Sequence, residues 1–86
     1  MVRQYDIVMT LVPKGEYPAG TYGVAVEVLP IPNATYKGVE VEIWDQYNYP
    51  CDEKGYHDYE LKSLSNEEIK ELMKRRNIQI ILEMHG

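Results

Sequence analysis

Apolar and polar positions alternate along much of the first 64 residues of the chain. Alternation with a period of two is typical of strands that turn one face to a core. All five prolines fall in the segments between the alternating stretches, where they favour loops. The pattern therefore predicts four strands before residue 65, and these are residues 5–12, 21–29, 39–45 and 58–64. The intervening segments 13–20, 30–38 and 46–57 are predicted as connections.

The third predicted strand, VEVEIWD at residues 39–45, has the clearest division into two faces. Side chains alternate across a strand, so aliphatic residues at every second position are expected to face the core. This places Glu40, Glu42 and Trp44 together on the opposite face. By the same argument the core-facing residues of strand 21–29 are expected to be Val24, Val26 and Val28.

After residue 64 the hydrophobic period changes to that of a helix. Ser65 followed by Glu68 is a capping box, and acidic residues precede basic ones, as the helix dipole favours. We expect a helix over residues 66–76 and, from renewed alternation, a fifth strand over 78–84. The expected order is β-β-β-β-α-β in one domain, 1–86, of the mainly β (α+β) class, with a small antiparallel sheet that is closed or nearly closed.

The charge of the chain bears on its partners. Nine Lys and Arg stand against fourteen Asp and Glu, a formal net charge of -5. A negative surface repels phosphate backbones and suits a basic protein partner, although it also serves solubility alone. The chain shows neither a signal-like segment nor an apolar run long enough for a membrane span, so we expect a cytoplasmic protein.

Candidate chemistry is sparse. Cys51 is the only cysteine, so an internal disulfide is excluded, and no basic cluster follows it to activate the thiol. Cys51, Asp52, His57 and Asp58 are metal-ligand types, but their spacing fits no zinc pattern. We therefore expect neither an enzyme, nor a metal site, nor a cofactor.

Four motifs resemble small bacterial SH3-like barrels: QYDIVMTLV, AGTYGVAVEVL, GVEVEIWD and DYELKSL, within residues 4–64. The resemblance implies an SH3-like antiparallel barrel of about five strands over that stretch, with the following helix and strand as an extension. It implies no enzyme activity. Some members of this family look like immunity proteins of polymorphic or contact-dependent toxins, and the chain departs from them in its aromatic segment 46–57.

Acidic and aromatic side chains gather on strand 39–45 and in the segment after it. Tyrosine and tryptophan dominate interface hot spots, and carboxylates around them steer a basic partner. We therefore predict an immunity protein or antitoxin that neutralises a basic toxin, for example a nuclease. The predicted partner-binding residues are Glu40, Glu42, Trp44, Asp45, Tyr47, Tyr49, Asp52, Glu53, Tyr56 and Asp58.

Several alternatives stay open at this point. Trp44 could complete the core beneath the C-terminal helix or strand. The domain could be a generic SH3-like adaptor or regulatory subunit. It could also be a nucleic-acid-binding barrel that uses the basic residues 74–76, although the negative net charge disfavours this role. The apolar strand predicted at 78–84 could pair with a second copy of the chain to form a homodimer.

Overall fold

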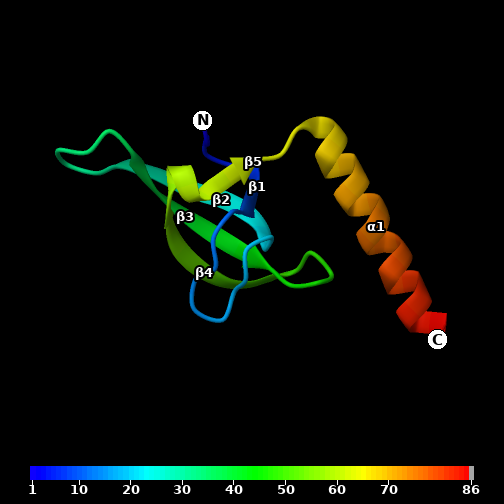
Figure 1. Cartoon of the computed structure of the whole chain (residues 1–86). Helices are drawn as coiled ribbons and strands as arrows, with labels where there is room; N and C mark the ends of the chain where they lie inside the picture. The colour runs from blue at the N-terminus through cyan, green and yellow to red at the C-terminus, as the bar shows by residue number, and fades with distance from the viewer. Residues whose placement is uncertain (86) are drawn as a thin grey trace.

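The structure, a computed structural model, describes residues 1–85, with side chains for residues 1–76. It contains one five-stranded antiparallel sheet and one C-terminal helix (Figure 1). The elements are β1 Ile7–Thr10, β2 Tyr22–Pro30, β3 Lys37–Trp44, β4 Pro50–His57, the 3₁₀ turn η1 Asp58–Glu60, β5 Leu61–Ser63 and α1 Asn66–His85.

The strands lie in the order β4-β3-β2-β1-β5, so β1 to β4 form a meander and β5 returns to the free side of β1. β4 and β5 are the two edges of the sheet, and the sheet is open. The mainly β fold with a C-terminal helix is thus confirmed, whereas closure into a barrel is not.

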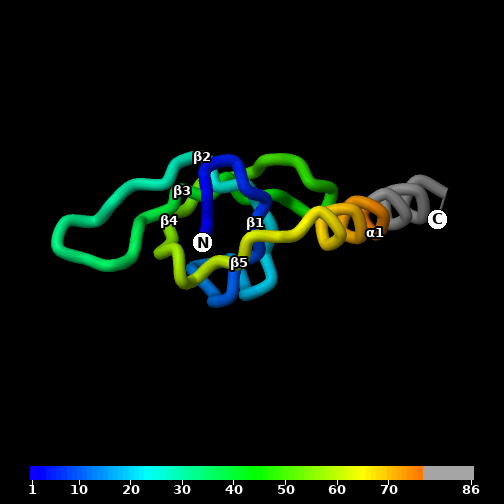
Figure 2. Tube along the Cα trace, turned by 90° about the horizontal axis from the view of Figure 1, so that it is seen from above, coloured from blue at the N-terminus to red at the C-terminus, as the bar shows by residue number. Residues whose placement is uncertain are grey.

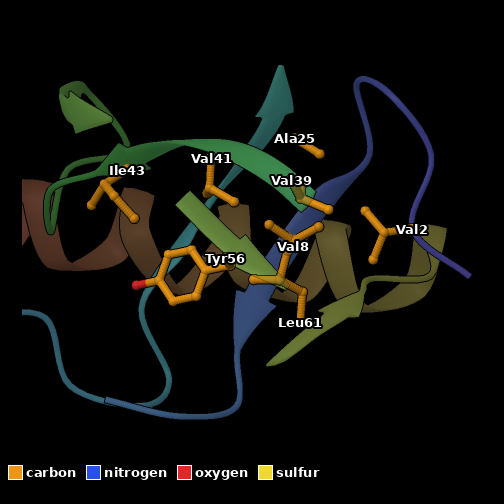
Figure 3. Close-up of a cluster of buried hydrophobic side chains, with 8 residues drawn as sticks. All are labelled: Val2, Val8, Ala25, Val39, Val41, Ile43, Tyr56 and Leu61. Carbon is orange, nitrogen blue, oxygen red and sulfur yellow. The ribbon is translucent and has the colours of Figure 1, made fainter. Parts of the chain in front are cut away.

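One face of the sheet carries the core. In β3, Val39, Val41 and Ile43 are buried, as the alternation predicts. Figure 3 shows them converging with side chains from the other strands and from the N-terminal segment. The cluster consists of Val2, Val8, Ala25, Val39, Val41, Ile43, Tyr56 and Leu61.

The predicted facing of β2 is wrong for two of its three valines. Val24 lies opposite Glu42 on the face away from the core, and Ala25 is the buried residue instead. A bulge at Val26 then shifts the register, which returns Val28 to the core side. Sequence alternation missed this because the strand reaches the core through Gly23 and Ala25, which have little or no side chain.

The segment 46–57, predicted as a loop, contains a strand instead. β4 pairs with β3 from Trp44 opposite Pro50 to Gly38 opposite His57. Only Tyr56 of this strand is buried, because β4 is an edge strand and most of its side chains meet solvent. Its polar composition therefore conceals the strand. The predicted strand 58–64 is in turn shorter, since η1 occupies residues 58–60.

The predicted fifth strand at 78–84 is also wrong, because α1 continues to His85. The order is therefore β-β-β-β-β-α, with β5 at residues 61–63. The segment after Asn77 contains no glycine or proline before Gly86, and it includes one each of Gln, Leu, Glu and Met, which favour a helix. The homodimer through a C-terminal strand loses its basis.

The start of α1 is fixed by the predicted capping box. The Glu68 N–H donates to Ser65 Oγ at 3.2 Å, and the Ser65 N–H donates to Glu68 Oε1 at 3.0 Å. Further along, Arg76 donates to the Gln46 carbonyl at 2.5 Å, and Leu72 is only 2% exposed. The helix starts after β5, and its residues up to Arg76 lie beside the β3–β4 turn (Figure 2).

Candidate interaction surface

The face of the sheet opposite the core is acidic at its centre. Glu40 of β3 lies directly across from Glu27 of β2, and Glu42 of β3 lies across from Glu53 of β4. Among the residues with described side chains, no ion pair or hydrogen bond engages these four carboxylates. We call Glu27, Glu40, Glu42 and Glu53 the acidic sheet face.

Like charges directly opposite each other on neighbouring strands destabilise a sheet. The acidic sheet face contains two such pairs. The isolated domain therefore bears a repulsion that a basic group placed over the face would relieve.

Trp44 shares this face but lies at the end that α1 approaches. Its side chain is half-buried. The guanidinium of Arg76 lies 5.6 Å from the ring centre of Tyr22, the β2 residue nearest that end. The same Arg76 is bonded to Gln46, two residues beyond Trp44. The helix thus closes off this end of the face, whereas Glu40 lies toward the opposite end of β3.

The predicted residues of the β3–β4 turn have mixed roles. Asp45 Oδ1 accepts the N–H groups of Tyr47 and Tyr49, at 2.8 and 3.0 Å, so this carboxylate builds the turn. Asn48 sits in the left-handed region with φ 65° and donates to Met73 Sδ at 3.3 Å. Tyr49 is well exposed, and Tyr47 is half-buried.

Two predicted partner-binding residues lie on the core side of β4. Tyr56 is 2% exposed and belongs to the core, contrary to its predicted place on an exposed surface, so its ring is not offered to a partner. Burial raises the pKa of its hydroxyl. Asp52 is exposed on the same side and accepts the Tyr17 hydroxyl at 2.7 Å. This hydrogen bond raises the pKa of Tyr17 and lowers that of Asp52.

Asp58, the last predicted residue, begins η1. Its carboxylate accepts the backbone N–H of Lys37 at 3.2 Å and so ties η1 to the start of β3. The predicted set is therefore divided between the acidic sheet face, the β3–β4 turn, the core side and η1.

An exposed aromatic cluster next to Asp58 was not predicted. Tyr36, His57 and Tyr59 have ring centroids 4.9 to 5.4 Å apart, and Tyr59 is 62% exposed. His57 Nδ1 also lies 2.9 Å from the Tyr59 hydroxyl. Tyr36 is distant from the other two in sequence, and the register that sets Gly38 opposite His57 brings them together. Only knowledge of the β3–β4 hairpin would have revealed the cluster.

A groove of about 390 Å³ adjoins this cluster, and His57 is one of its lining residues. One wall is apolar, formed by residues 29–32 with the sequence LPIP. Gly38 and Gly55 contribute backbone without side chains, and Glu40 supplies a carboxylate. Glu40 Oε2 would lie 3.9 Å from a Cβ at Gly55, which places the carboxylate over that glycine. We call this feature the Gly38/Gly55 groove.

The outer edge of β4 is covered by polar side chains. Lys14 Nζ donates to the Gly55 carbonyl, Glu60 Oε1 accepts the His57 N–H, and Asp52 Oδ1 accepts the Glu53 N–H, each at 2.8 Å. The hydrogen bond from His57 is the main cause of the lowered pKa of Glu60, and Lys14 adds to it. Further strand pairing at this edge is obstructed by these contacts.

Among the described residues, no three His, Cys, Asp or Glu side chains are grouped as a metal ion would require. Cys51 is exposed on β4. Over the described residues, no helix combines the length and the apolar character needed to cross a membrane.

Comparisons of the chain with protein family models, with curated proteins and with solved structures gave no match.

Proposed function

We propose that this protein is a protein-binding module, an immunity protein or antitoxin that neutralises a basic toxin, for example a nuclease. The observation that carries the proposal is the acidic sheet face, whose four carboxylates lack partners among the described side chains. A nuclease that binds phosphates presents the complementary basic surface.

Electrostatic energy supports this choice of partner. Within each of the two opposed acid pairs, the two carboxylates repel each other in the free domain. A basic surface relieves that repulsion when it binds. Complementary charge also raises the association rate, an advantage for a protein that must intercept a toxin.

Exposed aromatic rings near the acids support a protein partner. Tyr36 and Tyr59 lie beside the groove that contains Glu40, and Tyr49 projects from the β3–β4 turn. Tyrosine buries a large area on binding at low conformational cost and often forms hot spots.

A five-stranded antiparallel sheet in the order β4-β3-β2-β1-β5, with its fifth strand beside the first, supports an SH3-like interpretation of the sequence motifs. The family resemblance joins the acidic sheet face as support for an immunity function.

A second candidate is an SH3-like adaptor or regulatory subunit that holds a peptide or an enzyme. The aromatic cluster of Tyr36, His57 and Tyr59 favours it, because adaptor surfaces of this size commonly rely on clustered rings. Nucleic-acid binding has less support, since Arg76 is held by Gln46 and Tyr22.

Charge reversal on the acidic sheet face tests the proposal. We expect Glu42→Lys with Glu53→Lys to slow association with the product of the neighbouring gene by about tenfold or more at low salt, and to reduce its salt dependence. Stopped-flow or biosensor kinetics at several salt concentrations measure this. Folding is expected to persist, because one like-charged pair replaces another.

The matched control is Glu16→Lys with Glu71→Lys. Both positions are exposed and lie outside the acidic sheet face, and the net charge changes equally. Equal slowing by the two double variants would reduce the effect to net charge and refute this surface. A neighbouring toxin that neither binds the protein nor loses toxicity would refute the immunity function.

A further inference from the structure

We propose that the Gly38/Gly55 groove takes a lysine or arginine side chain from an extended segment of the partner, with Glu40 as its counter-charge. This inference rests on the proposed function and specifies the chemistry at one end of the acidic sheet face. It is supported by the shape of the groove, its apolar wall and the balance of charge within it.

The shape depends on two glycines. A Cβ at Gly38 would meet Ile31 at 3.8 Å, and one at Gly55 would meet Glu40 at 3.9 Å. Both distances are ordinary contacts, so neither glycine is required for folding on steric grounds. Their effect is to leave the floor without side chains, and a volume of about 390 Å³ remains open above it.

The wall suits an aliphatic stem. Leu29 is 54% exposed, and Pro30, Ile31 and Pro32 follow it along the groove. Lysine and arginine bury their methylene stems against such apolar surface while the charged head reaches a polar partner. Proline also limits the backbone freedom of the wall, which lowers the entropic cost of binding.

The charged side chains that line the groove favour a cation as its occupant. Lys14 also lines the groove, but its ammonium bonds the Gly55 carbonyl at 2.8 Å and lies 3.5 Å from Glu60. His57 Nδ1 is close to the Tyr59 hydroxyl and to Glu60. Glu40 has no such partner among the described side chains, so the groove presents one uncompensated negative charge.

The occupant belongs to a different protein rather than to a second copy of this chain. Two copies each carry a formal charge of -5 and repel each other as they approach. A basic partner is attracted by the same charge and can present its cation to Glu40.

Short peptides provide a direct test without the partner. We expect acetyl-Leu-Arg-Leu-amide to cause saturable shifts of the Gly38 and Gly55 amide signals in ¹H–¹⁵N spectra, with a dissociation constant on the order of 1 mM. The matched peptide acetyl-Leu-Glu-Leu-amide is expected to leave both signals in place. Equal shifts with the two peptides, or none with the first up to about 10 mM, would overturn the proposal.

Variants separate the groove from the rest of the acidic face. Glu40→Gln is expected to weaken binding of the arginine peptide about tenfold, because it removes a charge-assisted hydrogen bond. Glu53→Gln, which removes a carboxylate outside the groove, is expected to change it less than about twofold. Gly55→Ala fills the floor and is expected to weaken binding while the melting temperature stays near that of the wild type. Equal effects of Glu40→Gln and Glu53→Gln would refute the role of Glu40.

Two results would distinguish failure of this inference from failure of the proposed function. Partner capture that is unaffected by Glu40→Gln would exclude the groove and leave the immunity function standing. Peptide binding without any inhibition of a neighbouring toxin would retain the groove and exclude that function. Shifts of the same glycine signals with protein concentration alone would identify a second copy as the occupant and overturn the inference.

Discussion

Gly23 shows how one residue can determine the approach of two strands. It lies opposite Ile43 on the core side, and a Cβ there would collide with the backbone carbonyl of Glu42 and come within 2.9 Å of Val41 Cγ1. Backbone of a central strand cannot move aside as a flexible side chain can. The absence of a side chain at Gly23 is therefore a packing requirement.

We expect Gly23→Ala to lower the free energy of unfolding by about 3 kcal/mol, the upper part of the range for overpacked cores. Urea denaturation followed by tryptophan fluorescence measures the change. Gly38→Ala is the control, because its Cβ would make only ordinary contacts and its cost is expected to stay below about 1 kcal/mol. Similar losses in the two variants would contradict the steric explanation.

At the scale of elements, the sequence predicts those whose pattern is set by local contacts. β3 is a central strand with one face buried, so its alternation and facing were predicted correctly. The capping box likewise fixed the start of α1. β4 was not predicted, because an edge strand with one buried side chain has no apolar alternation. The end of α1 was predicted wrongly, because the apolar pattern of segment 78–84 is compatible with the period of a strand and with that of a helix.

The α1 capping box predicts a dependence on acid. The Lys62 ammonium, at 2.7 Å, and the Ser65 N–H lower the pKa of Glu68 to about 2 in the folded chain, from an ordinary value of 4.5. A depressed folded pKa stabilises the fold above the unfolded value. This contribution is therefore complete above pH 4.5 and is lost as the pH falls toward 2.

Glu68→Gln is expected to remove that part of the acid dependence, so the stabilities of variant and wild type converge as the pH approaches 2. Thermal unfolding at a series of pH values measures it. Glu71→Gln on the same helix, whose carboxylate makes no such contact, is expected to keep the wild-type profile. A constant difference between Glu68→Gln and the wild type at all pH values would contradict the assignment.

At the scale of the whole molecule, the residues that the sequence predicts as one interaction surface lie in separate regions. The prediction placed Glu40, Glu42 and Trp44 on one face, and the structure agrees. It also grouped Asp52 and Tyr56 with them, although both lie on the core side of β4. The aromatic cluster and the Gly38/Gly55 groove depend on strand register and could not be derived from periodicity.

The acidic sheet face is expected to cost stability in the free protein. Glu42→Gln removes the repulsion with Glu53, so we expect the free energy of unfolding to rise by about 0.2–1 kcal/mol at low salt. The gain is expected to shrink in about 0.5 M salt, because screening weakens the repulsion already. Chemical denaturation at two salt concentrations measures both. A loss of stability at low salt would show that Glu42 has a favourable partner.

The covered edge of β4 has a consequence for how the protein behaves when it is abundant. Lys14, Asp52 and Glu60 occupy hydrogen-bonding groups that a foreign strand would need, and the opposite edge, β5, offers only three residues. Both edges of the sheet are therefore expected to resist the strand addition that builds fibrils. A molecule protected in this way is expected to accumulate at high concentration without polymerising.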